Sequence, residues 1–68
     1  MTVQIKTTHG LTMHLYKVHN IYDLDKMYYI KSRPDDDINI SIEGDHVATC
    51  NSFSIKKTEI YSIDILHS

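Results

Sequence analysis

The stretch Ile38-Asn39-Ile40-Ser41-Ile42-Glu43, followed by Gly44-Asp45, decides the fold class of this 68-residue chain. Isoleucine occupies every second position and polar residues stand between, which is the two-residue period of a strand with one buried and one solvated face. Gly44-Asp45 favours a two-residue turn of type II′. Residues 46–51 then return as a second strand, so the stretch predicts a β-hairpin.

The same period extends toward the N-terminus. Residues 2–7 and 11–18 both alternate between apolar and polar residues, and His9-Gly10 between them supplies a reversal, since glycine readily adopts positive φ. These two segments predict a second hairpin. Residues 20–26 are ambiguous, because Asn20 suits the N-cap of a single helical turn but a wide turn fits equally well.

Residues 26–32 contain apolar and aromatic side chains at consecutive positions, which is typical of a strand covered on both faces. Pro34 ends this strand, because proline has no N–H to donate to a sheet. Phe53 and Ile55 resume the alternation after Asn51-Ser52. Residues 60–66 form the last expected strand, with Tyr61, Ile63 and Ile65 on one face and Ser62 and Asp64 on the other.

These segments predict an all-β fold for a single domain spanning residues 1–68. We expect five to six short antiparallel strands joined as hairpins, with at most one helical turn near residues 20–26. Two architectures fit: a small open barrel of the SH3-like or LSm-like kind, or a two-layer sandwich.

The size of the chain limits its stability and points to self-association. A domain near this length buries only about 60% of the surface that its unfolded chain exposes. Such folds are commonly stabilised by disulfides, a metal or oligomerisation. Cys50 is the only cysteine, so no disulfide can form within the chain. The lone cysteine, together with the lack of an export signal or membrane-length apolar run, predicts a cytoplasmic protein without membrane contact.

The charge distribution argues against simple nucleic-acid binding. Lys and Arg number 7 and Asp and Glu number 9, which gives a net charge of −2. Nucleic-acid binders usually have a basic excess because phosphate contacts dominate their affinity. Residues 1–22 carry +2 and residues 23–45 carry −4, so the middle of the chain is an acidic belt.

Motifs for chemistry are weak throughout the sequence. His9, His14 and His19 follow one another at five-residue spacing, and an odd spacing places neighbours on opposite faces of a strand. His46 and Cys50 share a face but stand about 13 Å apart along an extended strand, too far for an ordinary zinc pair. No nucleophile–base motif or phosphate-binding glycine loop is present. We therefore expect neither a metal, nor a cofactor, nor an enzymatic activity.

Tyrosines give the best indication of binding, since tyrosine is enriched at protein interfaces. Tyr28 and Tyr29 are consecutive in one predicted strand and must lie on opposite faces, so at least one leaves the core. The predicted interface consists of three tyrosines and an acidic rim: Tyr16, Tyr28, Tyr29, Asp35, Asp36 and Asp37.

The expected function is therefore non-enzymatic binding through protein–protein contact, with a second copy of the chain and with an unidentified protein. The AT-rich character of the composition suggests a phage or mobile-element accessory protein that inhibits or modulates a host (defence) factor in the host cytoplasm. One alternative is a nucleic-acid-binding barrel in which tyrosines stack on bases and lysines contact phosphates. The lysines in question are Lys6, Lys17, Lys31, Lys56 and Lys57. A second alternative is an oligomer that sequesters a small molecule or nucleotide between its subunits.

Overall fold

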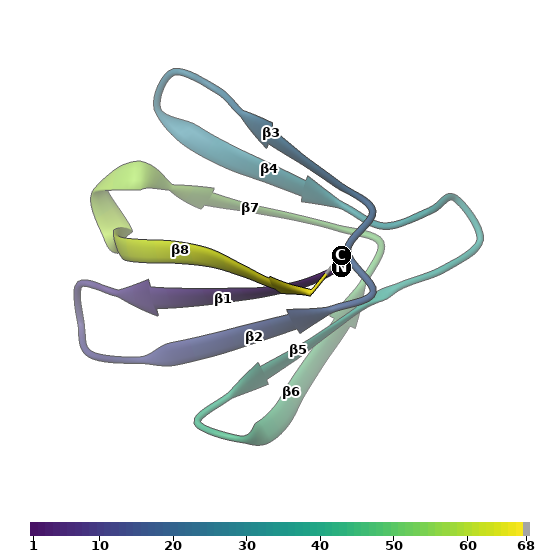
Figure 1. Ribbon diagram of the computed structural model, residues 1–68, viewed down its shortest axis with the longest axis horizontal. Helices are drawn as coiled ribbons and strands as arrows, with labels where there is room; N and C mark the ends of the chain where they lie inside the picture. Colours follow the sequence, from purple (N-terminus) through teal and green to yellow (C-terminus); the bar gives the residue numbers. More distant parts are fainter. Residues whose placement is uncertain (68) are drawn as a thin grey trace.

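The computed structural model describes residues 1–67 and contains two antiparallel sheets (Figure 1). The larger sheet has strand order β6-β5-β2-β1-β8, and the smaller has order β3-β4-β7. The elements are β1 (Thr2–Thr7), β2 (Thr12–Tyr16), β3 (Asn20–Asp23), β4 (Met27–Lys31), β5 (Ile38–Ile42), β6 (Asp45–Cys50), β7 (Ser52–Lys56), the 3-10 turn η1 (Lys57–Glu59) and β8 (Ile60–His67).

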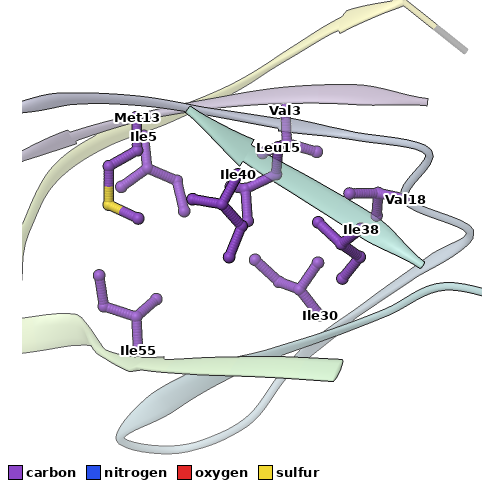
Figure 2. Packing of buried hydrophobic residues seen from close by; sticks show 9 residues of the cluster. All are labelled: Val3, Ile5, Met13, Leu15, Val18, Ile30, Ile38, Ile40 and Ile55. Atoms are coloured by element: carbon purple, nitrogen blue, oxygen red, sulfur yellow. The ribbon is translucent and has the colours of Figure 1, made fainter. Parts of the chain in front are cut away.

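The all-β prediction is confirmed, and the arrangement is the two-layer sandwich. Within residues 1–67 the two sheets stay separate and do not close into a barrel. Their facing surfaces supply the apolar core, which Figure 2 shows as side chains pointing inward from both layers. The buried core residues are Val3, Ile5, Met13, Leu15, Val18, Ile30, Ile38, Ile40 and Ile55.

The hairpin predicted around residues 38–51 is present, but its turn differs from the expected one. Ile42 lies opposite Asp45, so the central turn residues are Glu43 and Gly44. Both have positive φ, 53° and 85°, which is the type I′ pattern rather than type II′. Glu43 is held in this conformation by Thr12: its carboxylate Oε1 accepts the Thr12 N–H at 2.9 Å, and its own N–H donates to the Thr12 carbonyl at 3.0 Å.

The strand number and the pairing also differ from expectation. Within residues 1–67 eight strands form instead of five or six, and three of the strand pairs are distant in sequence: β2 with β5, β1 with β8, and β4 with β7. Residues 20–26, where a single helical turn or a wide turn fitted the sequence equally well, begin with strand β3 at Asn20–Asp23, and the helical turn lies at Lys57–Glu59 instead. The strand forms because Ile21 and Tyr22 pair across the sheet with Ile30 and Tyr29.

Asn51 divides the return segment into two strands that belong to different sheets. β6 pairs with β5 in the larger sheet, and β7 pairs with β4 in the smaller one. The Asn51 side-chain amide donates to the carbonyls of Arg33, at 2.8 Å, and Asp36, at 2.7 Å. It thereby fastens the β4–β5 loop to the point where the chain changes sheet.

Candidate interaction surface

The structure separates the three tyrosines of the predicted interface. Tyr28 faces inward and packs against the core, with the Lys57 ammonium 5.0 Å from its ring centroid. Tyr29 lies on the opposite, outer face of the smaller sheet, as the alternation predicts. Tyr16 is exposed on the larger sheet, where its ring stacks beside His14 at 6.2 Å between centroids. The three rings do not form one surface.

The acidic rim lies in the loop between β4 and β5 and is partly neutralised. Asp36 approaches the Lys17 ammonium at 3.9 Å, and its Oδ1 also accepts the Asp37 N–H at 2.9 Å. Asp37 contributes to the local charge near Cys50. The Asp36 carboxylate therefore ties the loop to Lys17 and to its own backbone. The role of the loop in an interface stays a prediction.

Both edges of the larger sheet are interrupted by β-bulges. On β6, Ile40 faces Ala48 but Ser41 faces His46, which leaves Val47 unpaired. On β8, shifts in the pairing with β1 leave Tyr61 and Leu66 between partners. These inserted residues are large, apolar and exposed, at 52% for Val47, 79% for Tyr61 and 44% for Leu66. Bulges disrupt the regular ladder that an added strand needs, so these edges are protected against pairing.

The exposure of Tyr61 corrects the expected face of the last strand. The alternation placed Tyr61 with Ile63 and Ile65 on one face, yet Ile60 takes the position opposite Thr7 and packs against the core. The bulge shifts the phase by one residue, because two residues of β8 then oppose one of β1. A bulge leaves no clear mark in the alternation of the sequence.

Strand β3 offers an open edge of a different kind. It lies at the margin of the smaller sheet, and no register shift interrupts its pairing with β4. The Leu24 N–H donates to the Met27 carbonyl, so Leu24 and Met27 are a hydrogen-bonded pair in the register of β3 with β4. Hydrogen-bonded pairs recur at every second residue of an antiparallel ladder, so the backbone groups of Asn20 and Tyr22 also point to β4. By alternation Ile21 and Asp23 direct theirs to the open side.

The other margin of the smaller sheet, β7, is less accessible. Asn51 alone joins it to β6, and η1 joins it directly to β8, so both of its ends lead straight into the larger sheet. A strand added beside β7 would meet these connections. Among the sheet edges of residues 1–67, β3 is therefore the one best suited to take an additional strand.

Tyr22 is the interface candidate that the sequence pattern missed. It lies directly opposite Tyr29, and the two ring centroids are 5.9 Å apart with their planes tilted by 31°. Tyr22 is 45% exposed, and Leu24 beside it is 46% exposed. A strand at Asn20–Asp23, had the sequence pattern been read as one, would have placed Tyr22 on a face of its own sheet opposite to that of Ile21.

The described residues offer no cluster of metal-ligating side chains. Within residues 1–67 no group of at least three His, Cys, Asp or Glu side chains is placed to share an ion. His14 Nε2 lies 3.1 Å from Gln4 Oε1, and His46 Nε2 lies 3.0 Å from Thr49 Oγ1, so both rings take part in local polar contacts. Burial, and then the carboxylate of Asp37, raise the pKa of the Cys50 thiol, which makes it a poorer nucleophile.

Comparison of the chain with protein-family models, curated proteins and solved structures gives no match. Among the residues that the structure describes, no helix has the length and apolar character needed to cross a membrane.

Proposed function

We propose that the protein is a non-enzymatic binding module that acts through protein–protein contact and pairs with a second copy of itself along β3. The observation that carries this proposal is the difference between the edges. The larger sheet has bulges at both margins, whereas β3 is regular and open. An unprotected edge strand presents free N–H and C=O groups that favour pairing with another chain.

The backbone of β3 selects a register for two copies related by two-fold symmetry. Tyr22 lies at the axis opposite Tyr22 of the second copy, and Ile21 lies opposite Asp23. In this register each Ile21 exchanges backbone hydrogen bonds with Asp23 of the other copy, which uses the groups that face the open side. It also keeps outward-facing side chains beside outward-facing ones, as a shared sheet requires.

The side chains agree with this register. The Tyr22–Tyr29 pair of one copy would continue into the equivalent pair of the other, since directly opposed residues of antiparallel strands contact each other. Asp23 is paired with the Lys57 ammonium, so its charge is already compensated near the symmetry axis. The dimer thereby extends the small sheet and places the two Tyr22 side chains next to each other at the symmetry axis.

The biological setting is the second part of the proposal. The composition suits a phage or mobile-element accessory protein that inhibits or modulates a host (defence) factor in the host cytoplasm. Tyr16 is exposed, and Asp35, Asp36 and Asp37 lie in the β4–β5 loop, so neither group belongs to β3 and both can contact such a target in the β3-paired dimer.

Substitution of Asp23 by proline tests the dimer directly. Proline removes the N–H that faces the open edge and leaves the hydrogen bonds between β3 and β4 in place, because prolines are tolerated on the solvent side of edge strands. The matched control is Asp23→Ala, which also loses the ion pair with Lys57 but keeps the N–H. We expect wild type and D23A to sediment as dimers and D23P as a monomer.

A second variant covers the case in which D23P fails to fold. Tyr22→Lys places like charges next to each other across the axis while leaving the β3 backbone intact, so it should also give a folded monomer. Circular dichroism establishes folding of each variant. A monomeric wild type over the accessible concentration range, or dimerisation of D23P and Y22K at wild-type strength, would refute pairing along β3.

A further inference from the structure

In the part of the chain that the structure describes, the outer face of the smaller sheet combines tyrosines with lysines and contains no acidic residue. Ile30 is fully buried, and Tyr28 packs against the core, so their neighbours in β4 point outward. The registers with β3 and β7 then identify the side chains that share this face. They are Asn20, Tyr22, Met27, Tyr29, Lys31, Ser52, Ser54 and Lys56.

The two lysines of this face lie on either side of the tyrosine pair. Lys56 lies opposite Met27 on one side of the Tyr22–Tyr29 pair, and Lys31 lies opposite Ser52 on the other side. Each lysine is two residues along its strand from the tyrosine row, a distance of roughly 7 Å. Positive charge thus flanks the aromatic rings on both sides, although the whole chain has a net charge of −2.

One end of the face continues into a depression of about 620 Å³. Three lysines line it, two of them from the start of η1 and the end of β7, together with one acidic residue. The Lys57 ammonium is paired with Asp23, which leaves Lys26 and Lys56 as its uncompensated cations within residues 1–67. The lining residues are Asp25, Lys26, Met27, Lys56, Lys57 and Thr58.

From this arrangement we infer that the outer face of the three-stranded sheet binds single-stranded nucleic acid. Bases stack on exposed aromatic rings whatever their sequence, and lysines beside the rings neutralise the backbone phosphates. A sheet face on which tyrosines lie next to lysines matches this ligand, because each unpaired base of a single-stranded nucleic acid lies close to a phosphate. A folded acidic protein would also neutralise the lysines, and competition with an acidic polypeptide distinguishes it from nucleic acid.

The site is complete on one copy of the chain and does not depend on pairing along β3. The structure also corrects the lysine set expected for such binding. Lys31 and Lys56 lie on this face and Lys57 lies at its end, but Lys6 belongs to the larger sheet and Lys17 to the β2–β3 connection, where it contacts Asp36. Lys6 and Lys17 therefore serve as matched controls.

The test measures fluorescence anisotropy of a labelled single-stranded oligothymidylate of about 20 nucleotides at roughly 20 mM salt. We expect wild type to bind and its affinity to fall as salt is raised. The double variant Lys31→Gln/Lys56→Gln should bind at least tenfold more weakly at low salt, because it loses two phosphate contacts. Each lost contact should also lower the slope of log affinity against log salt concentration by about 0.7. Lys6→Gln with Lys17→Gln removes the same charge and should change the affinity by less than about twofold.

Tyrosine variants separate stacking from charge. Tyr29→Phe should bind like wild type because it retains the ring, whereas Tyr29→Leu should lose about tenfold. Polyglutamate of matched charge serves as competitor, and D23P serves as the monomeric reference. Binding by D23P is expected, so loss of dimerisation and loss of nucleic-acid binding can be told apart.

The inference is overturned by any of three results. The first is that wild type does not bind the oligonucleotide at low salt. The second is that the two double-lysine variants weaken binding equally. The third is that polyglutamate displaces the oligonucleotide at equal charge concentration. The last result would identify the face as a site for an acidic protein instead.

Discussion

Ser32 and Asn51 are the polar side chains that fix the connections between the two sheets. Ser32 is 3% exposed, and its hydroxyl donates to the Lys17 carbonyl at 2.8 Å, where Lys17 has a positive φ of 65°. The Ser32 N–H donates to the Asn51 carbonyl at 2.9 Å. These bonds satisfy backbone groups at the places where the chain leaves one sheet for the other, and buried carbonyls without partners are costly.

Substitution of Asn51 by alanine should lower the free energy of unfolding by about 2 kcal/mol, because two carbonyl groups lose their donor. The matched control is Asn39→Ala, since the Asn39 side-chain oxygen accepts a long hydrogen bond from the Thr49 hydroxyl, at 3.4 Å. It should cost within about 0.5 kcal/mol. Denaturant unfolding at one protein concentration measures both values. Equal losses for the two variants would show that the Asn51 amide does not stabilise the loop.

The reactivity of Cys50 follows from the direction of its pKa. Burial and the Asp37 carboxylate raise the pKa above its ordinary value of 9.0, so the thiolate is scarcer than usual at a given pH. Alkylation should be slow near neutral pH and should continue to accelerate above pH 9.0. Asp37→Asn should lower the pKa and speed alkylation, whereas Asp35→Asn should leave the rate close to wild type. Identical pH profiles for wild type and D37N would contradict the contribution of Asp37.

At the scale of the elements, turns and bulges decide how the strands are used. The alternation of residues 38–42 is followed by the structure, but Glu43-Gly44 rather than Gly44-Asp45 makes the turn. Tyr28 and Tyr29 were correctly predicted to lie on opposite faces, because alternation is a property of any regular strand. The expected face of Tyr61 was wrong, since a bulge depends on the partner strand as much as on the local sequence.

The β5–β6 turn gives a prediction at this scale. Gly44→Ala should lower the free energy of unfolding by about 1 kcal/mol, because Gly44 has a φ of 85° and L-residues other than glycine and asparagine disfavour that region. No heavy atom lies within 4 Å of the position of a Cβ there, so the cost comes from the backbone alone. Gly44→Asn should cost less than Gly44→Ala, since asparagine tolerates positive φ. Thermal unfolding of the pair measures the difference, and an Asn variant less stable than the Ala variant would contradict this cause.

At the scale of the whole molecule, the two sheets present different surfaces. The larger sheet has bulged margins, whereas the smaller has an open edge at β3 and an outer face with Tyr22, Tyr29, Lys31 and Lys56. Both proposals concern the smaller sheet, yet they depend on different atoms: backbone groups of β3 for pairing, and outward side chains for nucleic acid. A dimer would place two such faces side by side and increase the effective affinity for a long strand.

The all-β class, the hairpins and the opposed faces of Tyr28 and Tyr29 were determined by the sequence itself. The reason is physical: alternation, turn residues and strand propensity act between near neighbours, so they can be read locally. The tertiary structure alone decided that β2 pairs with β5 and β1 with β8, that Asn51 carries the chain between sheets, and that Tyr22 joins Tyr29. These outcomes depend on which distant strands bury their apolar faces together, and many pairings satisfy the same local pattern. The surfaces on which function depends belong to this second group.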